Sequence, residues 1–93
     1  TIYNDLGILY EQDKKDYKQA INYFGQSFNL HNSYITLNNV GNSMYALGEY
    51  NKAIGIYEKS LFMNPNQPEL DESLKRLKEE VAGSKNAKQK DYL

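Results

Sequence analysis

Amide and phenol side chains recur at one helical spacing in this sequence, and they are the groups best suited to recognising another molecule. Asn38, Asn42 and Tyr45 follow one another at i, i+4 and i+7, so on a helix they share one face. An amide offers donors and an acceptor together, and it can pair with peptide N–H and C=O groups without requiring a charged ligand. Solvated residues in an Asn-rich chain would give the same pattern, so both interpretations stay open.

Catalytic chemistry lacks the residues it would need. His31 is the only histidine and there is no cysteine, which leaves no two-histidine or thiolate metal site, no thiol nucleophile and no complete histidine-based triad. The glycines are spread along the chain and do not form a phosphate-binding loop. Carboxylates such as Glu72 precede a cation such as Arg76 by one helical turn, as on a solvated face. We therefore expect no catalytic residues, no metal and no cofactor, and hence no enzyme.

Charge and hydropathy narrow the class of partner. The formal net charge of −1 gives no basic footprint for nucleic acid or for an anionic membrane surface. Apolar runs such as residues 7–10 are far shorter than the roughly 20 residues that cross a bilayer. We expect a protein or peptide partner, no nucleic acid and no direct membrane insertion, and the sequence does not indicate a compartment. Because the chain starts at Thr1 and enters an apolar pattern at once, we expect it to be a piece of a longer protein.

The elements that must position these groups are revealed by an internal repeat. The matched pairs are Tyr3/Leu37, Leu6/Val40, Gly7/Gly41, Tyr10/Met44, Tyr17/Tyr50, Ala20/Ala53, Phe24/Tyr57 and Ser27/Ser60. We call the distance between matched residues one period. In the first half of each unit it is the distance from Gly7 to Gly41, and in the second half, from Ala20 to Ala53, it is shorter by one residue. A fixed period of about 20 to 50 residues indicates stacked supersecondary units. The first unit carries one extra loop residue, which a loop tolerates and a helix does not.

Apolar residues at helical spacing predict an all-α fold with five helices. Their expected ranges are 1–12, 16–29, 33–47, 50–63 and 67–82. Gly48 and Asn64-Pro65 supply breaks, and Asn66 with Glu69 three positions later resembles a capping box at the start of the last helix. After residue 82 the apolar pattern stops, so residues 83–93 are predicted to be a basic flexible tail.

Two glycines inside predicted helices indicate close packing. Gly7 and Gly41 each cost about 1 kcal/mol of helix propensity relative to alanine. Their repetition in register favours a close approach of the partner helix, with Ala20 or Ala53 as the small surface opposite. Four tyrosines at repeat positions are predicted to lie in the core: Tyr10, Tyr17, Tyr50 and Tyr57.

These residues carry a family resemblance. The first unit, Tyr3-x2-Leu6-Gly7-x2-Tyr10 followed by Ala20-x3-Phe24, resembles the tetratricopeptide pattern W-x2-L-G-x2-Y, A-x3-F and a final Pro. The second unit repeats it as Leu37-x2-Val40-Gly41-x2-Met44, Ala53-x3-Tyr57 and Pro65. The resemblance implies a short right-handed α-solenoid of antiparallel hairpins over residues 1–82, with repeat 1 at 1–32, repeat 2 at 33–66 and a capping helix at 67–82.

The resemblance also implies a function and a site. Such arrays bind a peptide or protein partner in a concave groove built from the first helix of each unit. The residues expected to line that groove are Asn4, Ile8, Glu11, Asn38, Asn39, Asn42 and Tyr45. An alternative is a structural assembly element that stacks through the exposed ends of the array, including on other copies of itself.

One known partner class of the family is disfavoured. Some members hold the terminal carboxylate of chaperone tails with Lys, Arg and Asn side chains on the concave face. Asn39 fits that set, but Asn4 and Ile8 stand where Lys and Asn are wanted. Glu69 and Ser73 stand where two cations are wanted. An acidic tail would therefore meet little attraction.

Overall fold

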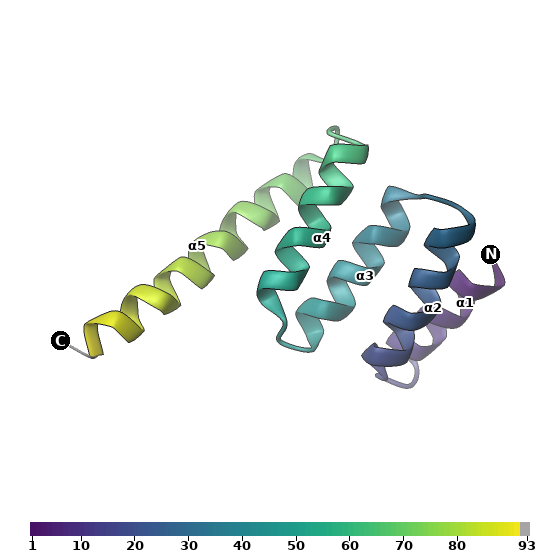
Figure 1. The fold of residues 1–93 in the computed structure, drawn as a ribbon, viewed down its shortest axis with the longest axis horizontal. Coiled ribbons are helices and arrows are strands. Elements are labelled where there is room, and N and C mark those ends of the chain that lie inside the picture. Colours follow the sequence, from purple (N-terminus) through teal and green to yellow (C-terminus); the bar gives the residue numbers. More distant parts are fainter. Residues whose placement is uncertain (92–93) are drawn as a thin grey trace.

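The computed structural model consists of five α-helices joined by short loops, and it describes the backbone of residues 1–91 and the side chains of residues 1–83. The helices are α1 (Ile2–Gln12), α2 (Tyr17–Leu30), α3 (Tyr34–Ala46), α4 (Tyr50–Met63) and α5 (Pro68–Asp91). They form two antiparallel hairpins, α1–α2 and α3–α4, followed by α5 (Figure 1). The all-α prediction is confirmed, and within residues 1–91 no strand is present.

Polar side chains fix where the first three helices begin. Thr1 and Asp16 accept hydrogen bonds from backbone N–H groups in the first turns of α1 and α2. Ser33 does the same for α3. Each acceptor satisfies an N–H that has no partner inside its helix. Gly48 makes the α3–α4 turn at a φ of 81°, a left-handed conformation that glycine adopts without a steric penalty.

The hairpins are held by a ring lying on bare backbone. A Cβ added at Gly7 would come within 2.5 Å of the Phe24 ring, and one added at Gly41 within 2.5 Å of the Tyr57 ring. The close approach predicted for these glycines is confirmed, but the surface opposite differs from the prediction. The aromatic ring faces the glycine, whereas Ala20 and Ala53, each fully buried, sit in the clusters that join one hairpin to the next helix.

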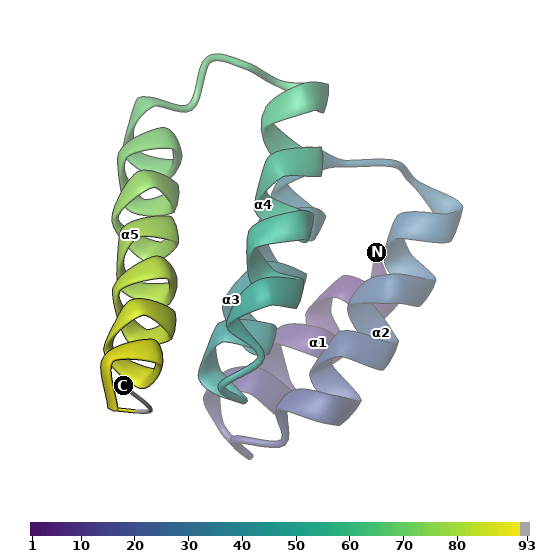
Figure 2. The ribbon, with the colours of Figure 1, turned by 60° about the vertical axis from the view of Figure 1, so that its left-hand side comes forward.

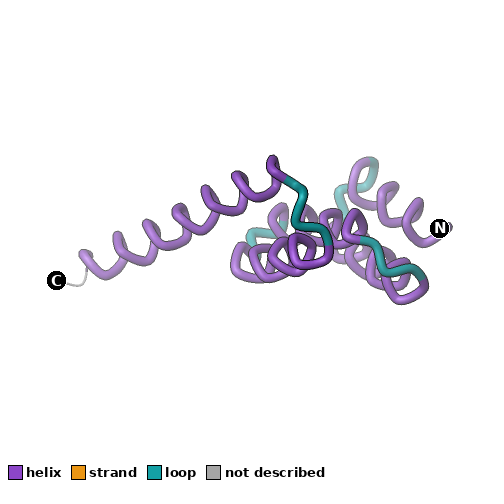
Figure 3. The backbone as a smooth tube through the Cα atoms, turned by 90° about the horizontal axis from the view of Figure 1, so that it is seen from above, coloured by secondary structure: helices purple, strands orange, loops and turns teal. Residues whose placement is uncertain are grey.

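The five helices form two layers. Helices α2 and α4 lie in one layer, and α1, α3 and α5 lie in the other (Figures 1 and 3). One buried cluster, Ala20 with Phe24 and Val40, joins α2 to α3. A second cluster joins α4 to α5 through Leu74 and Leu77. Figure 2 shows α5 running alongside α4. Outward side chains of α1, α3 and α5 therefore lie on one side of the molecule.

The fifth helix is longer than predicted. It continues through Gly83 to Asp91, so the predicted end of this helix at residue 82 is wrong; the flexibility predicted for residues 83–93 stays a prediction, and residues 92–93 lie outside the described part. Leu74 and Leu77 anchor the helix on α4, and the Lys, Ala and Gln residues that follow are good helix formers, so the single glycine does not end it. The helix extends beyond the end of α4 (Figure 1).

Two local predictions are also wrong. The Asn66 side chain does not start α5: its backbone N–H donates to Asn64 Oδ1, and the helix begins at Pro68, which suits the first position because it has no N–H to satisfy. Tyr50 is 45% exposed and lies outside the core. It begins α4 directly after the α3–α4 turn, where the centre of its ring lies 5.2 Å from that of the Tyr45 ring.

Candidate functional site

The amide and phenol stripe of α3 lines two adjoining pockets between α3 and α5. Asn42 and Tyr45 line a pocket of about 420 Å³, and Asn38 lines another of about 330 Å³. Leu70 of α5 lines both, so the two pockets form one continuous surface, which we call the α3–α5 groove. Leu37 and Val40, the core stripe of the same helix, are buried. The two faces of α3 are thus separate, as the spacing predicted.

The opposite wall of the groove comes from α5, and no α5 residue is among those expected to bind the partner, although the resemblance places Ser73 on the concave face. Ser73, Arg76 and Glu80 line the larger pocket with Leu70 and Leu77. The sequence favoured a solvated face for Arg76, with Glu72 one turn before it, and no such pair is among the ion pairs of the described side chains. The repeat could have revealed this wall, because Arg76 lies one period after Asn42.

Asn42 is oriented by a buried phenol. The Tyr57 hydroxyl donates to Asn42 Oδ1 at 2.6 Å, and both residues line the larger pocket. The pKa of Tyr57 is raised to about 12, mainly because the phenol is buried and in smaller part because Tyr45 and Glu11 carry negative charges when ionised. The phenol therefore stays protonated at neutral pH and keeps donating. Since the amide oxygen is occupied, the Nδ2 group is left to donate to a ligand.

Asn38 is held by Gln67, the residue just before α5. Its Nδ2 donates to Gln67 Oε1 at 2.9 Å. The Gln67 Nε2 group in turn donates to the Ser60 carbonyl, the Ser60 hydroxyl and the Asn64 carbonyl at 3.2, 3.1 and 2.9 Å. One side chain thus ties α3, the end of α4 and the start of α5 together. This network fixes the spacing of the α3–α5 groove.

The predicted site residues of the first hairpin lie outside both pockets. Ile8 packs against the buried cluster of Ala20, Phe24 and Val40. Glu11 accepts a hydrogen bond from the Ser43 hydroxyl at 2.7 Å, which links α1 to α3. Asn4 is half-buried, as is Asn39 on α3, and Asn39 also lines neither pocket. The structure therefore brings together Asn38, Asn42 and Tyr45 of the predicted set.

Two buried amide oxygens recur at the repeat spacing. Asn4 Oδ1 and Asn38 Oδ1 are both buried with no hydrogen-bond partner among the described residues. They occupy equivalent positions of α1 and α3, one period apart. Buried polar atoms are usually paired, so each of these positions has capacity for one more donor.

The groups that meet in the groove suit binding. They comprise an amide donor, a phenol, one guanidinium and one carboxylate around apolar Leu70 and Leu77. Within residues 1–83, no three His, Asp or Glu side chains lie close enough together to hold a metal ion. His31 is exposed at the end of α2.

Family models described as tetratricopeptide repeat match residues 11–32 and residues 35–61. The first match covers the end of α1 and the whole of α2, the second covers most of α3 and α4, and together they cover more than half of the chain. The chain belongs to the tetratricopeptide repeat family. No curated protein matches the chain.

Tetratricopeptide repeats generally mediate protein–protein interactions. In this tetratricopeptide chain α5 packs on α4 much as α3 packs on α2, so α5 takes the place of the first helix of a next repeat. Among the described residues, no helix combines the length and apolar character needed to cross a membrane.

Proposed function

We propose that this tetratricopeptide domain is a non-catalytic interaction module that binds an extended, largely uncharged peptide segment of a protein partner in the α3–α5 groove. One observation carries the proposal: an oriented amide, a half-exposed phenol and a guanidinium face the same pocket of about 420 Å³ from two different helices. Such groups pair with backbone N–H and C=O groups, while Leu70 and Leu77 offer apolar contact.

The charges around the groove favour an uncharged ligand. Arg76 is the one cation lining the larger pocket, and Glu80 lines the same pocket. Glu11 lies close enough to raise the pKa of Tyr57, so a second carboxylate contributes to the local field. A run of acidic residues would meet more repulsion than attraction here. This balance supports a neutral segment over an acidic tail.

Selection and affinity measurement test the proposal. A peptide would be selected from a displayed library of unstructured sequences on the full chain, and its affinity measured by calorimetry for Tyr45→Ala and Arg76→Ala. Both side chains are exposed and line the groove, and neither belongs to the hydrogen-bond network that holds α3 to α4 and α5. We expect each change to weaken binding at least about fivefold, the effect of a central interface residue.

Two matched variants serve as controls. Lys75→Ala removes the neighbouring cation of α5, and Phe62→Ala removes an aromatic side chain that is 88% exposed on α4; neither lines the groove. Both should leave the affinity within about twofold. A selected peptide that binds both groove variants as tightly as the parent chain would refute the groove assignment.

A further inference from the structure

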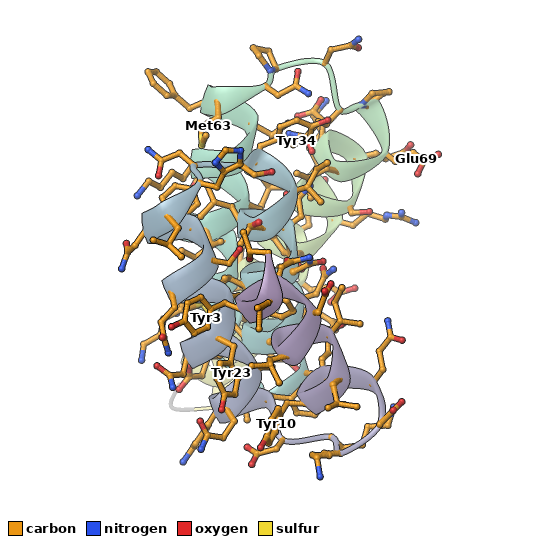
Figure 4. The ribbon with its side chains drawn as sticks, turned by 90° about the vertical axis from the view of Figure 1, so that its right-hand side faces the viewer. Tyr3, Tyr10, Tyr23, Tyr34, Met63 and Glu69 are labelled. Carbon is orange, nitrogen blue, oxygen red and sulfur yellow. The ribbon has the colours of Figure 1, made fainter. Side chains whose placement is uncertain are left out.

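The smaller pocket of the α3–α5 groove is lined by one carboxylate and two amides. It has a volume of about 330 Å³, and the residues that line it are Asn38, Gln67, Pro68, Glu69 and Leu70. Of the described residues around it, none is Lys or Arg. Glu69 is exposed, and Figure 4 shows its side chain projecting outward from α5. The carboxylate therefore stands at the rim of the pocket.

Two backbone carbonyls fix the orientation of both amides. The carbonyl groups of Ser60 and Asn64 can only accept, so the Gln67 atom that lies 3.2 and 2.9 Å from them must be Nε2. The Gln67 oxygen then faces Asn38, which must present Nδ2 to it, at 2.9 Å. Turning either amide over would set oxygen against oxygen. Asn38 Oδ1 is consequently the atom left over, and it is buried with no hydrogen-bond partner among the described residues.

The pocket thus offers three acceptors to a ligand. Asn38 Oδ1 is unpaired, Gln67 Oε1 has one lone pair left after accepting from Asn38, and Glu69 adds its carboxylate. The Gln67 Nε2 hydrogens are already in use, and Pro68 has no N–H to offer. A lysine ammonium has three donors and no acceptor and matches three separate acceptors, whereas the planar fork of arginine suits a single carboxylate.

The equivalent position in the first hairpin lacks the carboxylate. Asn4 Oδ1 is also buried with no partner among the described residues. One period before Gln67 and Glu69, however, lie Ser33 and Ile35, which carry neither an amide nor a charge. Of these two equivalent sites, the one between α3 and α5 is therefore the one that combines the three acceptors.

We propose that the smaller pocket binds the ammonium group of a lysine side chain carried by the peptide segment that the α3–α5 groove takes. This inference rests on the function proposed above, and it specifies one residue of a segment that is otherwise uncharged. The ammonium donates to Asn38 Oδ1, Gln67 Oε1 and the Glu69 carboxylate, while the methylene stem of the lysine lies along Leu70. Arg76 opposes the ammonium little, because it lies two helical turns, or about 10 Å, further along α5 than Glu69.

Competitive selection on the full chain tests the proposal. Two displayed libraries of unstructured sequences are mixed, with random positions restricted to uncharged residues and a central position that is lysine in one library and methionine in the other. We expect the lysine library to be recovered at least about fivefold over the methionine library, the effect of a charged hydrogen-bonded group at a partly exposed site. Glu69→Gln should remove most of this preference. Calorimetry on a recovered lysine peptide and its lysine-to-methionine variant should give the same ratio of affinities.

Glu72→Gln is the matched control. It removes the same charge from α5 at an exposed position that lines neither pocket. It should leave the preference for lysine within about twofold of that of the parent chain. Equal recovery of the two libraries, or equal effects of Glu69→Gln and Glu72→Gln, would overturn the proposal.

The outcomes separate this inference from the proposed function. Methionine-library peptides that lose affinity for the Tyr45→Ala chain, together with no preference for lysine, would overturn the lysine assignment and leave the groove in place. Peptides that bind Tyr45→Ala and Arg76→Ala as tightly as the parent chain would refute the groove. Recovery of no peptide from either library would overturn both.

Discussion

Substitution of Gly41 by alanine should destabilise the protein even though alanine is the better helix former. An alanine Cβ at this position would lie 2.5, 2.8 and 3.0 Å from three carbons of the Tyr57 ring. Carbon atoms prefer separations of about 3.5 to 4.0 Å, so the ring must retreat by about 1 Å. Tyr57 is 8% exposed and packed with Ala53, Leu74 and Leu77, which leaves it little room.

The expected magnitude follows from three opposing effects. Overpacking a filled site costs about 1 to 3 kcal/mol. Displacing the ring also strains the hydrogen bond from the Tyr57 hydroxyl to Asn42, which contributes on the order of 1 kcal/mol. Alanine returns about 1 kcal/mol of helix propensity. The net loss should be about 1 to 3 kcal/mol of unfolding free energy, or about 5 to 15 °C in the thermal midpoint of a domain this size.

Gly55 provides a matched control on α4. An added Cβ there meets nothing within 4 Å, so Gly55→Ala gains helix propensity without a clash. It should stabilise the protein by up to about 1 kcal/mol. Urea denaturation followed by far-UV circular dichroism would measure both variants against the parent chain. The two substitutions are chemically identical and are expected to shift the midpoint in opposite directions.

A double variant tests whether the clash with the Tyr57 ring causes the loss of stability. Combining Gly41→Ala with Tyr57→Leu removes the ring that the new methyl meets, so the loss should be smaller than the sum of the two single losses by about 1 kcal/mol or more. If the two losses simply add, or if Gly41→Ala is as stabilising as Gly55→Ala, the contact between Gly41 and Tyr57 does not explain why both hairpins carry a glycine at this position.

Two further predictions concern the groups behind the groove. Because the pKa of Tyr57 is raised from 10.0 to about 12, the unfolded chain loses this proton before the folded chain does as pH rises. The free energy of unfolding should therefore fall by roughly 2 to 3 kcal/mol between about pH 10 and 12. In urea titrations over the same pH range, the Tyr57→Phe variant should lose roughly 2 to 3 kcal/mol less than the parent chain. Gln67→Ala removes the partner of Asn38 and Ser60 and should cost about 1 to 3 kcal/mol, whereas Asn66→Ala, an exposed neighbour, should cost less than about 0.5 kcal/mol; equal losses would refute the bridging role.

The fold was predictable because its repeating unit occurs twice in the sequence. Each hairpin places a glycine on its first helix and an aromatic residue on its second, and the step from Gly7 to Gly41 fixes the register of one hairpin on the next. The predictions that failed concern parts of the chain to which the repeat does not extend. The end of α5 depends on helix propagation from an anchored segment, and a sequence pattern based on apolar residues cannot detect a helix that has none to bury.

Half of the candidate site was predictable, for a related reason. The stripe of Asn38, Asn42 and Tyr45 follows from helical geometry alone, since all three lie on one helix. The other wall depends on where α5 docks, and α5 lacks the Leu-Gly pair that identifies a first helix in this family. Its leucines nevertheless keep the period, with Leu74 one period after Val40, so extending the register by one unit would have placed Arg76 on the same layer as Asn42.

The α3–α5 groove depends on the repeat, which places α5 next to α3, and also on Gln67, a residue that differs from its equivalent in the preceding repeat. Its equivalent one period earlier is Ser33, which only caps α3 by accepting from the Ile35 N–H. A serine at position 67 could cap α5 but is too short to reach Ser60, Asn64 and Asn38 together. The longer amide replaces a cap confined to one helix with a bridge between three segments. The spacing between α3 and α5 is then set by a side chain outside the repeat consensus, and the width of the groove can vary among such arrays without any change in their cores.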